Sequence, residues 1–134
     1  MERSTSKDNA KSACLFCNIP TERIIEENEL AYVIEDNFPV TEKHTLVIPK
    51  RHVSSYFELT EEEVIACDSL LEKNKDRILI TDSSISGFNI GINIGEDAGQ
   101  TIFHCHIHLI PRRKGDVINP KGGVRGVIPS KQSY

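Results

Sequence analysis

The stretch "TIFHCHIHLI", residues 101–110, places a histidine at every second position: His104, His106 and His108. In a β-strand, alternate side chains point to the same face of the sheet. The spacing therefore predicts a strand with three imidazoles on one face and the apolar side chains between them on the other.

A single metal ion bound by all three histidines fits this strand poorly. The outer two are four residues apart, which is roughly 13 Å along an extended chain. Zinc needs its nitrogen ligands within about 2.1 Å of the ion. The three side chains therefore have separate roles, or they form the polar outer face of an ordinary strand.

The segments before this stretch predict other strands. Residues 86–95 alternate apolar with small or polar side chains, and a turn at 96–100 makes an antiparallel hairpin with the histidine strand the expected arrangement. Two earlier strands are expected at about 30–34 and 45–48, the second ended by Pro49.

"LTEEEVIACDSLLEKNKDRILI", residues 59–80, predicts one main helix. Thr60 and Glu63 have the spacing of a capping box at its start. A helix with these strands indicates an α+β domain. The stripe expected to cover the sheet consists of Val64, Cys67, Leu71, Asn74 and Ile78.

Composition narrows the class of protein. A chain of 134 residues with a net charge of −4 suits one domain without a general basic field, so we expect no nucleic-acid partner. We find no signal peptide and no long apolar run, so we expect a cytoplasmic protein with no membrane partner. In that reducing compartment, C-x-x-C at Cys14 and Cys17 indicates zinc or redox chemistry more often than a disulfide.

Three motifs together resemble the histidine triad (HIT) superfamily of nucleotidyl hydrolases and transferases. They are H-C-H-I-H-L-I at 104–110, the preceding "GQT" at 99–101, and "IEDNFPVTEKHTLVIPKRH" at 34–52. The resemblance implies a HIT-like fold, an antiparallel β-sheet of about five strands covered by one main helix plus a short one. It divides the chain into a flexible leader at 1–13, a HIT domain at 14–118 and a mostly irregular tail at 119–134.

The resemblance also implies an activity. His106 matches the family's nucleophile, which attacks the α-phosphorus of a nucleotide and forms a nucleotidyl-histidine intermediate. His108 would stabilise phosphate charge or assist the leaving group, and His44 would complete the phosphate site. The implied enzyme is a hydrolase that releases a nucleoside monophosphate from a nucleoside polyphosphate, for example a diadenosine polyphosphate, so its partner is an AMP-containing small molecule.

Other matched positions imply substrate contacts. Asp36 corresponds to a carboxylate that accepts hydrogen bonds from ribose hydroxyls, although a strand-ending turn is the alternative reading. Asn93 corresponds to an asparagine near the phosphates, although it could be an outward-facing strand residue. The residues expected to donate to phosphate oxygens are Gly99, Gln100 and Thr101.

A zinc site is implied at the N-terminus of the domain. The matched ligand set is Cys14, Cys17, His52 and His104, which suits one closed, structural Zn²⁺ per chain. The alternatives are a redox pair or two buried thiols. The remaining cysteines, Cys67 and Cys105, are expected in the core.

The sequence departs from the family at two places. Lys43 stands before His44 where the family commonly has glycine. The chain also continues 26 residues past His108, whereas the phosphoramidase branch of the family usually ends sooner, and its segment "PRRKGDV", 111–117, resembles the dinucleoside polyphosphate hydrolases and their bacterial relatives. Its basic residues could contact a polyphosphate or form a solvated turn; they are Arg112, Arg113 and Lys114.

Three other functions stay open at this point. A nucleoside phosphoramidase would use the same His106 nucleophile with an amine leaving group. A non-catalytic nucleotide-binding or interaction protein would not need that nucleophile. A thiol redox protein would use Cys14 and Cys17 without zinc. The resemblance also implies a homodimer.

Overall fold

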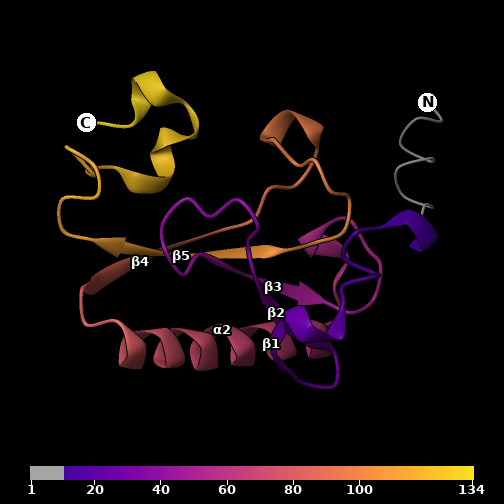
Figure 1. The fold of residues 1–134 in the computed structure, drawn as a ribbon. Coiled ribbons are helices and arrows are strands. Elements are labelled where there is room, and N and C mark those ends of the chain that lie inside the picture. The colour runs from indigo at the N-terminus through magenta and orange to yellow at the C-terminus, as the bar shows by residue number, and fades with distance from the viewer. Residues whose placement is uncertain (1–10) are drawn as a thin grey trace.

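The computed structural model describes residues 11–134, so residues 1–10 of the expected leader lie outside the described residues. Five strands form a single antiparallel sheet in the order β1-β2-β3-β5-β4. One long helix, α2 (Glu61–Thr81), runs along one face of this sheet, while η4 and the C-terminal tail lie on the other side (Figure 1). The predicted α+β fold with five strands and one main helix is confirmed. The strands are β1 (Ile24–Glu27), β2 (Ala31–Glu35), β3 (Thr45–Pro49), β4 (Ile85–Gly91) and β5 (Ile107–Arg113).

The connections carry short 3₁₀ helices. No helix among the described residues is long and apolar enough to cross a lipid bilayer. The tail folds into two 3₁₀ segments, the first of which contacts β4. The six segments are η1 (Lys11–Ala13), η2 (Thr21–Arg23), η3 (Tyr56–Glu58), η4 (Glu96–Ala98), η5 (Gly123–Val127) and η6 (Pro129–Lys131).

Helix α2 begins at the predicted capping box. The Thr60 hydroxyl accepts from the Glu63 N–H, and the Glu63 carboxylate accepts from the Thr60 N–H at 2.8 Å. The same carboxylate accepts from Arg51 Nε and Nη2, each at 2.9 Å. Of the predicted stripe, Cys67, Asn74 and Ile78 are buried, whereas Val64 and Leu71 are only partly buried. Leu70 takes the place of Leu71 on the buried face. This face packs on the apolar side chains of β2, β3 and β5 to form the core.

The opposite face of the sheet carries one continuous cross-strand row. Ile24 pairs with Ile34, Ile34 with Leu46, Leu46 with His108, and His108 with Gly91. Directly paired residues of an antiparallel sheet point to the same face. The row therefore runs from apolar side chains on β1 to β3 to a histidine on β5 and a glycine on β4.

The strand predicted at 101–110 is wrong at both ends, and of its three histidines only His108 lies in a strand. β5 begins at Ile107, and the connection from β4 spans 92–106 instead of a five-residue turn. Pairing between β3 and β5 extends no further than Val47 with Ile107, because β3 ends at Pro49, which has no N–H for the ladder. The segment before β5 instead contacts the loop that follows β3, where the Cys105 N–H donates to Val53 O at 2.7 Å.

Candidate functional site

A cavity of about 520 Å³ lies on the sheet face opposite α2, above the cross-strand row. Its size is in the range of small-molecule sites, and its wall is mainly apolar with a few polar side chains. The apolar part includes Phe16, Ile34 and Leu46. Seven of the eight residues predicted for catalysis or substrate binding line the cavity: Asp36, His44, Asn93, Gly99, Thr101, His106 and His108.

His106 is buried and held in one tautomer. Its Nδ1 lies 2.8 Å from the carbonyl oxygen of His104, and because a carbonyl can only accept, Nδ1 carries the hydrogen. Nε2 is left with its lone pair free. The ring packs edge-on against Phe16, with centroids 5.0 Å apart. Burial lowers the pKa of His106 below the usual value of imidazole, so the ring is neutral near pH 7.

A chain of hydrogen bonds fixes the tautomers of the other two catalytic candidates, His44 and His108. Val40 N–H donates to His44 Nδ1 at 3.0 Å, so the hydrogen of neutral His44 is on Nε2. That Nε2 lies 2.9 Å from His108 Nδ1 and donates to it. His108 therefore carries its own hydrogen on Nε2. This nitrogen is buried and has no hydrogen-bond partner among residues 11–134, so the chain ends in an unused donor.

Burial also controls the charge of these two rings. Burial, and then the neighbouring His106 and His44, lower the pKa of His108 to about 4. Burial lowers the pKa of His44 as well, against an opposing effect of Asp36. His44, His106 and His108 thus supply neutral imidazoles at physiological pH, as a nucleophile or hydrogen-bond donor requires.

Asp36 joins the same cluster from the end of β2. One carboxylate oxygen accepts from Phe38 N–H at 2.8 Å, and the other lies 3.5 Å from His44 Nε2 and 3.9 Å from His108 Nδ1. These three groups are close enough to surround a metal ion. The hydrogen bond from Val40 argues against that, because a metal at His44 Nε2 would require the hydrogen to move to Nδ1, where an N–H already points.

Lys43 has a backbone conformation that suits glycine. Its φ is +75°, and it is the one non-glycine residue with positive φ in the described part of the chain. Such a conformation brings Cβ close to the backbone and costs about 1–2 kcal/mol. The tight turn is needed because His44 N–H donates to Thr41 O at 3.1 Å directly before His44 enters the cavity wall.

Gln100 does not line the cavity. Its side chain is buried and its amide hydrogens donate to Ser54 O at 2.9 Å and Ile102 O at 3.1 Å. Its carbonyl oxygen accepts from Gly95 N–H at 2.9 Å. The side chain fastens the loop between β4 and β5, so its donors do not point to the place where we expected a phosphate.

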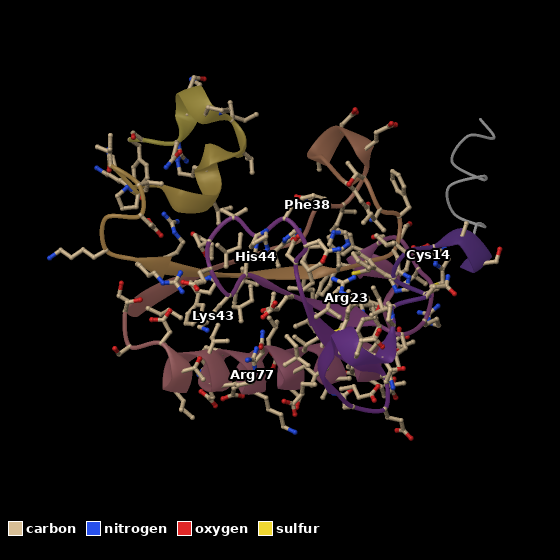
Figure 2. The ribbon with its side chains drawn as sticks, viewed as in Figure 1. Cys14, Arg23, Phe38, Lys43, His44 and Arg77 are labelled. Atoms are coloured by element: carbon tan, nitrogen blue, oxygen red, sulfur yellow. The ribbon has the colours of Figure 1, made fainter. Side chains whose placement is uncertain are left out.

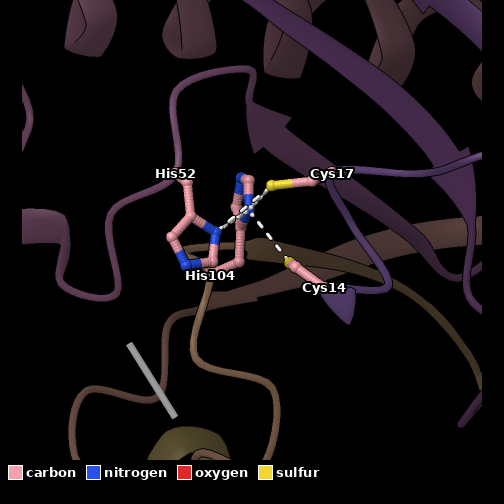
Figure 3. Close-up of side chains that lie close together, drawn as sticks. All are labelled: Cys14, Cys17, His52 and His104. Atoms are coloured by element: carbon pink, nitrogen blue, oxygen red, sulfur yellow. Dashed lines mark hydrogen bonds between the residues drawn. The ribbon is translucent and has the colours of Figure 1, made fainter. Parts of the chain in front are cut away.

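The four expected metal ligands converge at a separate place (Figure 3). His104 Nδ1 lies 3.4 Å from Cys14 Sγ, 3.5 Å from Cys17 Sγ and 3.3 Å from His52 Nδ1, and Cys17 Sγ lies 3.2 Å from His52 Nδ1. A tetrahedral zinc with ordinary bond lengths places its ligand atoms about 3.3–3.8 Å apart. The donor set therefore fits such an ion.

The orientation of His104 supports this fit. Its side chain is wholly buried, and its Nε2 lies 2.7 Å from Pro49 O, so Nε2 carries the hydrogen and Nδ1 presents a lone pair to the cluster. All four cysteines are free thiols. Burial raises the pKa of Cys67 to about 11 and that of Cys105 to about 12, as expected for core residues.

The basic run at the end of β5 is engaged elsewhere. Arg112 binds the Asp116 carboxylate through two nitrogens at 2.8 Å, and Arg113 contacts Asp82 at 2.8 Å. Neither arginine lines the cavity. These contacts favour the interpretation of this segment as a turn over its interpretation as a polyphosphate-binding run.

Eleven of the eighteen residues that line the cavity were not predicted as site residues, Phe16 and Arg23 among them. Phe16 lies between the two cysteines of C-x-x-C and is 5% exposed, in contact with the His106 ring. Arg23 is the last residue of η2, directly before β1, and it is the one arginine among the residues that line the cavity. Nothing in their spacing marks them as site residues, because the pairing of β1 with β2 is what brings this segment to the cavity.

The chain is similar to known proteins in sequence and in fold. A sequence model of the HIT domain matches residues 18–115. The chain is 39% identical over 110 residues to Protein hit of Bacillus subtilis, covering 77% of this chain and 74% of that protein. It is similar to a Zn-bound histidine triad family protein from Mycobacterium smegmatis, with a TM-score of 0.69, 35% identity and 81% of each chain covered. It is also similar to Plasmodium falciparum diadenosine triphosphate hydrolase, with a TM-score of 0.66, 30% identity, and 75% of this chain and 68% of that chain covered. This chain belongs to the HIT family.

Proposed function

We propose that this protein hydrolyses a nucleoside polyphosphate at its α-phosphorus through a nucleotidyl intermediate on His106. The observation that carries the proposal is the arrangement of two neighbouring imidazoles with opposite roles, one buried and one partly buried. His106 presents a lone pair on Nε2, and His108, with its ring centroid 5.2 Å away, presents an N–H on Nε2. A nucleophile beside a donor suits attack on a phosphate whose oxygens need hydrogen bonds.

In the first step, the lone pair of His106 Nε2 forms a bond to the α-phosphorus, and the bond from that phosphorus to the bridging oxygen breaks. The leaving phosphate takes the bonding electrons. His106 then carries a positive charge, which the hydrogen bond from Nδ1–H to the His104 carbonyl offsets. His108 Nε2–H donates to an oxygen of the phosphate or of the leaving group.

In the second step, water attacks the same phosphorus. The P–N bond breaks, its electrons return to His106 Nε2, and a nucleoside monophosphate leaves with the oxygen of the water. One proton of the water is released with the products. Both steps leave the His44–His108 chain as it began, so one enzyme molecule completes many cycles.

The substrate we propose first is a dinucleoside polyphosphate such as a diadenosine polyphosphate. The similarity to a diadenosine triphosphate hydrolase supports this class. Asp36 would bind the ribose hydroxyls, and Asn93, Gly99 and Thr101 would contact the phosphates from the cavity wall. Gln100 would act indirectly, by holding the loop that carries these residues.

We also propose one structural zinc ion per chain, bound by Cys14, Cys17, His52 and His104. The tetrahedral spacing of their donor atoms and the similarity to a Zn-bound family member support this proposal. With four protein ligands, the ion would fix the N-terminal segment on the sheet and would have no open position for substrate. Free thiols suit a cytoplasmic location.

A homodimer is part of the same proposal. β4 is an edge strand, and its Ile90 is 53% exposed, which leaves backbone and apolar surface available to a second copy. Sedimentation equilibrium of the full chain tests this point, and a monomer at micromolar concentration would contradict it.

The test of the catalytic proposal is to trap the intermediate. The full-length protein is mixed with a dinucleoside polyphosphate labelled at the α-phosphorus, quenched in base, digested and mapped for phosphohistidine. We expect label on His106 alone. In the His106→Ala variant we expect retained binding of nucleoside monophosphate with no label and no turnover. Label on another residue, or unchanged turnover in the variant, would contradict the mechanism, and a parallel assay with a nucleoside phosphoramidate tests the amine leaving group.

A further inference from the structure

The cross-strand row under the cavity sets the orientation of a bound nucleotide. His108 and Ile34 are two strand spacings apart on this row, on the order of 10 Å at about 4.8 Å per spacing. The reactive phosphorus must lie at the histidine end, beside His106. A nucleoside monophosphate extended along the row therefore places its base over Leu46 and Ile34, at the apolar end.

Arg23 lies beyond that apolar end. It precedes Ile24, the outermost residue of the row, and in the view of Figure 2 it lies to the right of His44, toward the segment that carries Cys14. Its Nη2 donates to the carbonyl oxygen of Glu35 at 3.1 Å. This bond attaches the guanidinium to the end of β2, next to Asp36.

The guanidinium is otherwise uncommitted. Among residues 11–134, the bond to Glu35 is its one hydrogen bond, and no carboxylate of these residues forms an ion pair with it. An arginine side chain has five N–H donors and no acceptor. Arg23 thus brings several unused donors, and only donors, to the wall of the cavity.

These donors lie at the opposite end of the row from the reacting centre. β1 is three strand spacings from β5, roughly 14 Å, and the bond to Glu35 keeps the guanidinium at the β2 side. The ligand atoms that reach this end of the cavity are those on the edges of the base that face away from the phosphate, among them the edge that carries N7 and the substituent at C6.

We infer that Arg23 is a base-reading residue that selects a 6-oxopurine, guanine or hypoxanthine, over adenine. This inference rests on the proposed function, because it takes the phosphate to be bound at the histidine end. Guanine presents two neighbouring acceptors, O6 and N7, which match the arginine fork. Adenine presents an amino group beside N7, so one donor of Arg23 faces another donor and loses its bond. A diadenosine polyphosphate is then still a substrate, and a dinucleoside polyphosphate that places a guanosine half in the cavity is bound more tightly.

The experiment measures binding of three monophosphates to the full-length protein by isothermal titration calorimetry. GMP and IMP share O6 and N7, and AMP lacks O6. We expect GMP and IMP to bind at least about tenfold more tightly than AMP, the discrimination given by one bidentate pair. In Arg23→Met, GMP and IMP are expected to weaken to the level of AMP, while AMP changes little. 7-Deaza-GMP, which lacks N7, is expected to lie between GMP and AMP in the wild-type protein.

Two controls keep the result specific. Lys114→Met removes one positive charge from an exposed position outside the cavity and should keep the wild-type preference. A circular-dichroism melt verifies that Arg23→Met is folded. Equal affinities for GMP and AMP in the wild-type protein, or a preference that survives Arg23→Met, would overturn the role of Arg23.

Failure of this inference differs from failure of the proposed function. If the protein labels His106 and hydrolyses dinucleotides but binds GMP and AMP equally, the role of Arg23 alone is wrong. If it binds none of the monophosphates and forms no intermediate, the proposed function is wrong and the role of Arg23 with it.

Discussion

His44 donates from Nε2 to Nδ1 of His108 across 2.9 Å, and the Val40 N–H fixes the direction of that bond. The bond joins a loop residue, placed by the Lys43 turn, to a strand residue on β5. Its consequence is chemical, because it determines which nitrogen of His108 carries the hydrogen that faces the cavity. Two residues 64 positions apart in the sequence thus specify one donor.

Replacing His44 tests this relay. In His44→Ala, His108 can place its hydrogen on Nδ1, so Nε2 no longer donates. We expect kcat to fall on the order of 10²-fold or more, as for loss of a positioned acid or donor, with a smaller change in KM. Steady-state kinetics on a dinucleoside polyphosphate measure the effect, and a kcat within twofold of wild type would mean that the relay is not used.

The lowered pKa of His108 predicts a pH dependence of stability. Unfolded, this imidazole titrates near pH 6.5, whereas in the fold its pKa is about 4. Between these values the unfolded chain binds a proton that the folded chain does not, so the free energy of unfolding decreases as pH falls from 6.5 toward 4. We expect a loss on the order of 1–3 kcal/mol from this group, measured by urea unfolding at pH 7 and pH 4.5. The His108→Asn variant should show a shallower dependence, and an identical slope would count against the assignment.

The turn at Lys43 predicts a stabilising substitution. Glycine adopts positive φ without the clash of a Cβ, so Lys43→Gly should raise the free energy of unfolding by about 1 kcal/mol. Lys43→Ala, which keeps the Cβ, is the matched control and should give no such gain. Urea denaturation with unchanged m-values measures both variants. A destabilised Lys43→Gly would show that the side chain contributes more than the backbone strain costs.

The cluster at Cys14 and His104 predicts bound zinc. Protein purified without chelator should contain about one zinc per chain by atomic emission, and Cys17→Ser should lose most of it and unfold at lower temperature. Cys67→Ser, which changes a thiol outside the cluster, is expected to retain the metal. A thiol redox protein would instead contain little zinc and turn over a disulfide substrate.

Much of the fold was predictable from local patterns. The capping box at Thr60 fixed the start of α2, because both of its hydrogen bonds form between residues three apart. The β-rich runs marked β2 and β3, and the alternation before the triad marked β4. β1 was not predicted, since its four residues include two glutamates and are defined by pairing with β2.

Errors in the prediction came from long-range contacts. The histidine strand was predicted to begin six residues too early and to end three residues too early, because alternation alone cannot show where the neighbouring strands pair with it, and here β3 stops at Pro49. Gln100 was expected at the phosphates, but three hydrogen bonds to distant or neighbouring backbone hold it in the loop. Arg23 and Phe16 carry no local signal at all.

The sequence by itself determined the residue types and their spacing: three alternating histidines, a C-x-x-C pair and one capped helix. These features depend on neighbours a few positions away, and they sufficed to predict the family, the sheet and two separate histidine roles. Only the tertiary structure decided which nitrogen of each imidazole bears the hydrogen, which side chains line the cavity and where its apolar end lies. Those properties depend on partners dozens of residues distant, such as Val40, Pro49 and Glu35, whose positions are fixed only when the sheet has formed.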